Sequence, residues 1–133
     1  MRLLGILVMS ALISACSTDF NPRYYYYGIE LANLTGETIT NLDIQVGADG
    51  RQLTCDEVTN NRICHERFGK RPYPTDGVRV SWQNASGETL TRELNPSVPI
   101  TMVPSLAVGL VMEIDENNEI SARFRQESFR LGG

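Results

Sequence analysis

The part of the chain with the strictest two-residue period is Gly77–Gln83, GVRVSWQ. Three apolar residues alternate here with polar ones, which is the pattern of a β-strand with one buried face. A short loop that contains glycine, Asn84–Gly87, separates this run from a second one, Glu88–Leu94. This order predicts a β-hairpin with Trp82 in the core.

Four further runs are rich in β-branched, aromatic or aliphatic residues. Tyr24–Leu31 and Thr38–Val46 are separated by a turn-like cluster, and we expect them to pair as a hairpin. The alternation of the second run shifts at Leu42, which predicts a β-bulge. Leu106–Ile114 and Glu119–Arg125 flank a polar turn and predict another hairpin.

No amphipathic helical period is visible along the chain. Three prolines between Asn95 and Ser105 favour a connecting loop or an edge over a central strand. Parallel sheets need long crossovers, which are usually helical. The sequence therefore predicts an all-β fold, an antiparallel β-sandwich of six to seven strands, immunoglobulin-like or transthyretin-like. The cysteine–tryptophan–cysteine order of true immunoglobulin domains is absent, because Cys55 and Cys64 both precede Trp82.

The length and composition indicate one folded domain. The chain has 133 residues, of which 41% are hydrophobic and 21% are charged, and these values are typical of globular proteins. We expect residues 24–126 to form the domain and residues 127–133 to form a C-terminal tail. The formal net charge of -4 disfavours a nucleic-acid partner, because phosphate binding needs a basic surface.

Residues 1–15 have the features of an export signal. Arg2 supplies a positive charge, and Leu3–Ile13 is apolar except for a glycine and a serine. This run is too short to span a bilayer, which takes roughly 20 apolar residues. The next residues, Ile13-Ser14-Ala15-Cys16, are one aliphatic residue, two small residues and a cysteine. This order resembles the lipobox of bacterial lipoproteins, and the alternative is a secretory signal with a coincidental cysteine.

The resemblance implies that the leader is removed before Cys16 and that the cysteine is lipidated. Two or three acyl chains, each methylene contributing about 0.8 kcal/mol, would make the attachment stable. Ser17 follows where lipoproteins of the inner membrane commonly carry aspartate, so the resemblance implies the outer membrane, with the domain facing the periplasm. A bacterium with a single membrane is also compatible with the sequence. Residues 16–23 then form the lipidated cysteine and a short tether, whose last seven residues span at most roughly 25 Å.

Cys55 and Cys64 remain as an even pair outside the cytosol, which predicts a disulfide. The bond would close a short loop and stabilise the domain by roughly 2 to 3 kcal/mol. A zinc site needs about four ligands, and the chain offers only His65 beside these cysteines. The spacing of a redox pair is also absent. We therefore expect a structural disulfide, no metal and no cofactor.

The segment Arg62–Arg71, RICHERFGKR, has four basic residues against Glu66, a local charge of +3 in an acidic chain. We expect a disulfide-pinned basic loop that contacts an acidic partner, a lipid headgroup or an anionic polymer. The candidate contact residues are Arg62, His65, Arg67, Phe68, Lys70, Arg71 and Tyr73. The alternative is a solvated loop whose arginines pair with local acids.

The tyrosine run Tyr24–Tyr27 has two interpretations. Alternation would bury two of the rings and expose two, and exposed tyrosines just after a lipid anchor suit a membrane or protein interface. Strand propensity alone explains the same residues.

Enzymatic chemistry finds little support in this sequence. A nucleophilic site would need His65 as its base, but His65 adjoins a cysteine and no GxSxG motif is present. We therefore expect a small lipid-anchored envelope protein that acts without catalysis through contacts with an unknown envelope protein, as an accessory, assembly or protective factor. One alternative is an immunity or inhibitor protein against a toxin or a cell-wall hydrolase. Another is a binding module for peptidoglycan or a small ligand.

Overall fold

The structure is a computed structural model that describes residues 24–48 and 50–126. The predicted leader, lipidated cysteine, tether and C-terminal tail lie outside these ranges. Within them the chain forms eight strands: β1 (Tyr25–Asn33), β2 (Ile39–Val46), β3 (Gln52–Val58), β4 (Ile63–Pro72), β5 (Val78–Gln83), β6 (Thr89–Leu94), β7 (Val108–Ile114) and β8 (Ile120–Gln126). Among the described residues no helix has the length and apolar character to cross a membrane.

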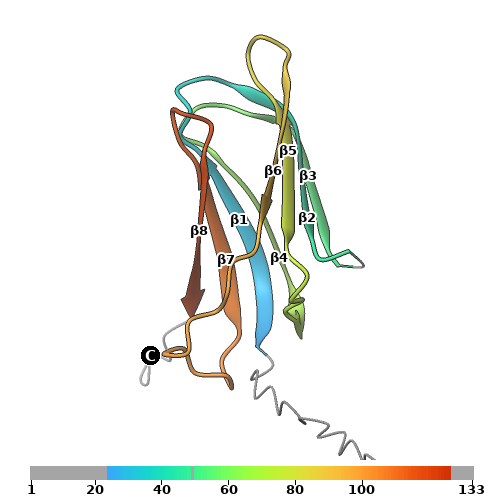
Figure 1. Cartoon of the computed structure of the whole chain (residues 1–133), viewed down its shortest axis with the longest axis vertical. Coiled ribbons are helices and arrows are strands. Elements are labelled where there is room, and N and C mark those ends of the chain that lie inside the picture. The colour runs from blue at the N-terminus through green and yellow to red at the C-terminus, as the bar shows by residue number, and fades with distance from the viewer. Residues whose placement is uncertain (1–23, 49, 127–133) are drawn as a thin grey trace, which may run out of the picture.

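The strands form two four-stranded sheets that face each other (Figure 1). One sheet has the order β4-β1-β7-β8 and the other has the order β3-β2-β5-β6. The predicted all-β sandwich is confirmed, although the described residues hold eight strands rather than six or seven. Strands β1 and β7 pair in parallel, whereas the other neighbours pair antiparallel.

The core lies between the two sheets, where the inward-facing side chains of both meet. Trp82 of β5 is fully buried, as predicted, and so are Leu31 of β1 and Leu110 of β7. Burying one such large apolar side chain contributes about 1.5 to 3 kcal/mol. The two-residue period visible in the sequence is therefore the main determinant of the sandwich.

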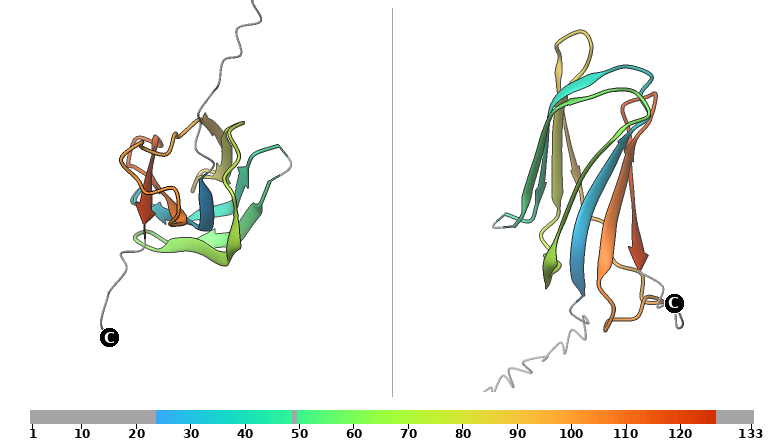
Figure 2. Two further views of the ribbon diagram at one scale, coloured as in Figure 1. Left: turned by 90° about the horizontal axis from the view of Figure 1, so that it is seen from below. Right: turned by 180° about the vertical axis from the view of Figure 1, so that it is seen from behind.

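Two of the three predicted hairpins are confirmed and the first is wrong. β5 pairs with β6 from Val78↔Leu94 to Gln83↔Thr89, and β7 pairs with β8. By contrast, β1 and β2 lie in different sheets, and the chain crosses from one sheet to the other between them (Figure 2). The apolar sides of β1 and β2 thus belong to the two opposing faces of the core, and β1 finds its backbone partners in β4 and β7.

The bulge predicted in β2 is present. The pairing of β2 with β5 shifts register between Thr40 and Asp43. Asn41 within this shift has a φ of 49°, a left-handed conformation that asparagine tolerates better than most residues. Its side-chain amide donates a hydrogen bond of 2.8 Å to Oε1 of Gln83 on β5. The extra residue keeps Leu42 and Ile44 on the buried side.

Strands β3 and β4 were not predicted as strands. Residues 62–71 were predicted to form a disulfide-pinned basic loop, and this prediction is wrong, because Ile63–Pro72 is a strand. β3 and β4 are edge strands, one in each sheet, and charged residues are typical of edge strands because they discourage pairing with other chains. The charged residues that suggested a loop therefore belong to an edge strand.

The predicted disulfide between Cys55 and Cys64 is confirmed. It joins β3 to β4, and the Cα atoms of the two cysteines lie 6.2 Å apart. Because β3 and β4 belong to different sheets, the bond links the two layers covalently along one edge. Cys64 is only 2% exposed and belongs to the core.

Asn33 is a buried polar residue at the end of β1, and each side-chain atom that can hydrogen-bond does so. Its Nδ2 donates to the carbonyl oxygens of Glu37 at 2.7 Å and of Val58 at 2.9 Å. Its Oδ1 accepts from the backbone amide of Thr35 at 3.1 Å and from the Thr35 hydroxyl at 2.7 Å. These bonds fix the crossing between the sheets, because Val58 lies on β3 and Asn33 on β1.

Candidate functional site

The basic segment of the sequence forms β4, whose side chains lie on two faces, and an irregularity in the pairing of β4 with β1 interrupts the strict alternation. Cys64 and Phe68 point inward and contact the core, while His65, Arg67 and Lys70 are exposed. The structure therefore does not bring all seven predicted contact residues to one surface.

Phe68 and Tyr73 belong to a row of aromatic rings inside the sandwich. Tyr26 meets Phe68 at 4.9 Å and Tyr73 at 5.5 Å between ring centroids, and Tyr73 meets Phe124 at 5.3 Å. All three contacts are edge-to-face, which is a favoured geometry for aromatic pairs. Burial raises the pKa of Tyr73 to about 12, and it also raises the pKa of Tyr26. Phe68 and Tyr73, which were predicted to contact a partner, therefore pack against the core of the domain instead.

Two arginines cover the outer end of this aromatic row. The guanidinium of Arg51 lies 4.9 Å from the Phe68 ring centroid and forms an ion pair with Glu66. The guanidinium of Arg71 lies 5.6 Å from the same ring. Both arginines line a shallow depression with Tyr26 at the end of the domain where β1 begins.

The outward side chains of β1 and β4 form pairs of one cation and one tyrosine. The guanidinium of Arg67 lies 5.1 Å from the Tyr27 ring centroid, and Nζ of Lys70 lies 4.8 Å from the Tyr25 ring centroid. Such cation–π contacts contribute about 0.5 to 1 kcal/mol at exposed sites. We call these four residues the basic–aromatic strip.

Gly109 on β7 makes room for the Tyr27 ring. A Cβ atom added to Gly109 would lie 3.0 Å from the Tyr27 hydroxyl oxygen and 3.1 Å from its Cζ. The ring therefore lies across the sheet over Gly109, where an added Cβ atom would require the ring to shift by a few tenths of an ångström. This packing orders Tyr27, and with it the position of the Arg67 guanidinium that stacks on the ring.

The rest of this sheet face carries ion pairs. Arg125 on β8 contacts Glu30 on β1 at 2.6 Å, and Arg123 contacts Glu113 on β7 at 3.0 Å. His65 lies opposite Glu30 in the register of β4 with β1. Glu30 and Glu113 are thus paired with arginines of β8, the edge strand at the opposite side of the sheet from β4.

Arg62, one of the seven predicted contact residues, does not lie beside the basic–aromatic strip. Arg62 lies in the turn between β3 and β4, and its backbone amide donates to the carbonyl of Thr59 at 3.1 Å. It is therefore at the opposite end of β4 from Lys70.

The burial of the tyrosine run also differs from the prediction. Only Tyr26 is fully buried, whereas two of the four rings were expected to be buried. The role of Tyr25 and Tyr27 as partners of the cations was missed, because it follows from the pairing of β1 with β4.

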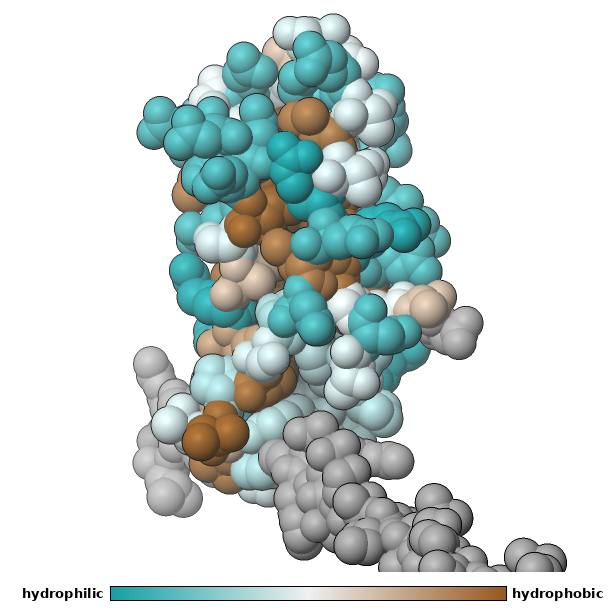
Figure 3. Space-filling view, in the orientation of Figure 1, coloured by the Kyte–Doolittle hydropathy of each residue, from teal (hydrophilic) through white to brown (hydrophobic). Residues whose placement is uncertain are grey.

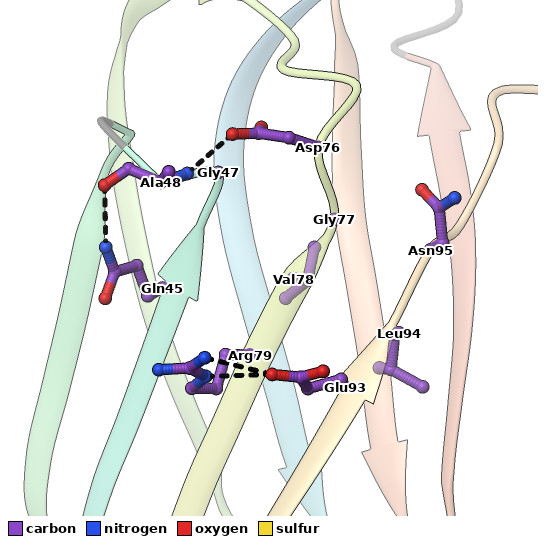
Figure 4. A pocket seen from close by; sticks show the side chains of 10 residues that line it. All are labelled: Gln45, Gly47, Ala48, Asp76, Gly77, Val78, Arg79, Glu93, Leu94 and Asn95. Carbon is purple, nitrogen blue, oxygen red and sulfur yellow. Dashed lines mark hydrogen bonds and ion pairs between the residues drawn. The ribbon is translucent and has the colours of Figure 1, made fainter.

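A second depression of about 570 Å³ lies at one end of the other sheet (Figure 4). Its charged side chains already have partners: Arg79 pairs with Glu93 at 3.0 Å, and Asp76 accepts from the backbone amide of Ala48 at 2.9 Å. None of the described residues that line it is aromatic. This depression therefore lacks the stacking surface that a sugar or another small cyclic ligand would use.

The described residues also contain no cluster of three or more side chains suited to hold a metal ion. In the acidic turn between β7 and β8, the first carboxylate accepts hydrogen bonds from backbone amides of the turn. Oδ1 of Asp115 accepts from the amides of Asn117 at 2.8 Å and Glu119 at 3.0 Å. This turn is therefore explained by hairpin geometry.

Comparison with known proteins found no family model and no curated protein that matches the chain. Among solved structures, the chain is similar to an NMR structure of a protein from Eubacterium rectale, with 19% sequence identity and a TM-score of 0.48. The match covers 85% of this chain and 98% of that one. A likeness of this strength carries no argument about function.

Proposed function

We propose that this protein is a lipid-anchored envelope lipoprotein that acts without catalysis by binding an acidic protein partner through the basic–aromatic strip. The observation that carries the proposal is the outward placement of Arg67 and Lys70 on β4, each stacked on a tyrosine of β1. The chain as a whole has a net charge of -4, so a local basic surface is a departure that attracts anionic groups.

The position of the strip on an edge strand supports recognition of another protein. β4 is the last strand of its sheet, so one side of its backbone has no strand neighbour among the described residues. Tyrosine and arginine are enriched at protein interfaces because they combine a large apolar surface with polar groups. The strip offers both residue types in a rigid, sheet-based arrangement.

Reversing two charges of the strip tests the binding proposal. We expect the double substitution Arg67→Glu and Lys70→Glu to weaken capture of the partner from envelope extracts at least about tenfold, because charge repulsion replaces attraction. Capture by the wild type should also decrease as salt is raised. The readout is the amount of each envelope protein recovered at several protein concentrations.

The matched control is Arg79→Glu, an exposed arginine of the other sheet whose side chain is 63% exposed. Its partners should be those of the wild type. Equal recovery by the wild type and the double variant would contradict the assignment of the strip.

The lipid anchor is tested by Cys16→Ala. We expect this variant to lose acylation, to keep its leader and to show altered electrophoretic mobility, because the sulfur that accepts diacylglycerol is gone. The measurement is acylation with a labelled fatty acid, together with mobility and membrane fractionation. Ser17→Asp is the control, which should remain lipidated but move to the inner membrane. Unchanged acylation and mobility of the Cys16 variant would overturn the lipoprotein proposal.

A further inference from the structure

The connection between β6 and β7, residues 95–107, contains no charged residue in a chain that is 21% charged. Two of its aliphatic side chains are exposed: Ile100 at 91% and Val103 at 49%. Single exposed aliphatic residues are common. Two close together on an uncharged, proline-containing segment form a small apolar surface, which we call the apolar tip.

The apolar tip is held in place by hydrogen bonds from the first and last described parts of the domain. The Tyr24 hydroxyl donates to the carbonyl oxygens of Pro99 and Met102, both at 3.4 Å. The Gln126 side chain accepts from the Val103 amide at 3.0 Å and donates to the Val103 carbonyl at 2.7 Å. The exposure of the two aliphatic side chains is therefore part of an ordered conformation.

The apolar tip lies at the end of the domain where the chain enters β1 (Figure 1), and Figure 3 shows hydrophobic surface at this end. Tyr24 binds the segment directly, and Tyr25 is half-buried beside it in sequence. Tyrosines at the base of an exposed apolar segment are typical of surfaces that meet the membrane–water interface. Seven residues separate Cys16 from Tyr24, and they span at most roughly 25 Å.

We propose that the apolar tip inserts Ile100 and Val103 into the lipid surface that carries the anchor. This inference rests on the proposed lipidation of Cys16, because the tether keeps the apolar tip within reach of that surface. The anchor and the apolar tip would both hold the same end of the domain at the membrane, so the long axis of the sandwich would point away from the membrane surface. In this orientation the basic–aromatic strip lies on the side of the domain, where a partner beside the domain can bind it.

A fluorescent probe at two sites tests the insertion. In the proposed lipoprotein, acylation blocks Cys16 and the disulfide blocks Cys55 and Cys64, so an introduced cysteine is the reactive thiol. Mature lipidated protein with Thr101→Cys carries the probe on the apolar tip, and Ser86→Cys carries it in the turn between β5 and β6 at the opposite end (Figure 1). Both proteins are reconstituted in phosphatidylethanolamine–phosphatidylglycerol vesicles that contain a spin-labelled lipid as quencher.

We expect at least twofold quenching of the probe at residue 101 and no quenching at residue 86. Adding Ile100→Asp to the first protein should abolish most of the quenching, because a carboxylate resists transfer from water into lipid. The matched control is Ile63→Asp, at the start of β4, where the isoleucine is 47% exposed. This control should leave the quenching at residue 101 unchanged.

Vesicle flotation separates the failure of this inference from the failure of the anchor. Protein that floats with the vesicles but shows equal quenching at residues 101 and 86 overturns the insertion and leaves lipidation intact. Quenching that does not respond to Ile100→Asp also overturns it. Protein that does not float at all overturns the anchor, and with it the insertion.

Discussion

Asn33→Asp is expected to lower the free energy of unfolding by about 3 to 5 kcal/mol at pH 7, the cost of an unpaired buried charge. Asn33 is fully buried, and its amide nitrogen donates to the carbonyl oxygens of Glu37 at 2.7 Å and Val58 at 2.9 Å. A carboxylate would turn these two attractive contacts into repulsive ones. Urea unfolding followed by circular dichroism measures the loss.

The effect of this substitution should depend on pH. Burial and the two carbonyl oxygens raise the pKa of the new carboxyl group above its unfolded value of about 3.9. The folded state then binds more protons than the unfolded state between these two pKa values. Hence the variant is least destabilised below about pH 4, and its stability relative to the wild type falls as pH rises through the folded pKa.

Asn60→Asp is the matched control for this substitution. Oδ1 of Asn60 accepts from the backbone amide of Gly36 at 2.9 Å, and a carboxylate can accept the same bond. We expect a change within about 0.5 kcal/mol, as for most exposed positions. A loss that is equal in the two variants, or independent of pH, would contradict the role assigned to Asn33.

Removing the disulfide with Cys55→Ala and Cys64→Ala is expected to lower the free energy of unfolding by about 2 to 3 kcal/mol, because the unfolded chain regains the entropy of an open loop. The backbone pairing of β2 with β3 and of β1 with β4 does not depend on the sulfur atoms, so both sheets should still form. Urea unfolding with and without reductant measures the loss.

The wild type under reducing conditions is the internal control for the disulfide. It should lose about as much stability as the double alanine variant, whereas the variant should not respond to reductant. If the reductant left the wild-type unfolding midpoint unchanged, the bond would contribute nothing to stability.

The features of the fold that were predicted correctly are encoded by neighbouring residues. The hairpin of β5 with β6 joins runs that are separated by one short loop, and the alternation around Trp82 fixes its buried face. The disulfide follows from the count of cysteines and from the compartment that the leader implies. The bulge at Asn41 is visible as a shift in the alternation of one strand.

The features that were missed depend on contacts between distant segments. After β1 the chain turns into the opposite sheet to form β2, because the backbone partners of β1 are β4 and β7, which residues 63–72 and 108–114 supply. The outward cations of β4 stack on tyrosines of β1. This contact cannot be predicted from the residues of β4 alone, because the tyrosines lie far away in the sequence. The cations of the candidate site were visible in the sequence, but the pairing of Lys70 with Tyr25 depends on a register shift between Tyr26 and Gly28.

The parallel pairing of β1 with β7 has a consequence for the order of folding. β1, the first strand among the described residues, occupies an inner position of its sheet, and one of its two partners ends at Ile114. Contacts between residues so far apart in sequence form slowly. If the proposed leader directs export, β1 emerges from the membrane well before β7, and its sheet stays incomplete until residues 108–114 have also emerged. If the protein is exported as proposed, the topology that closes the sandwich therefore also delays completion of the fold until β7 has crossed the membrane.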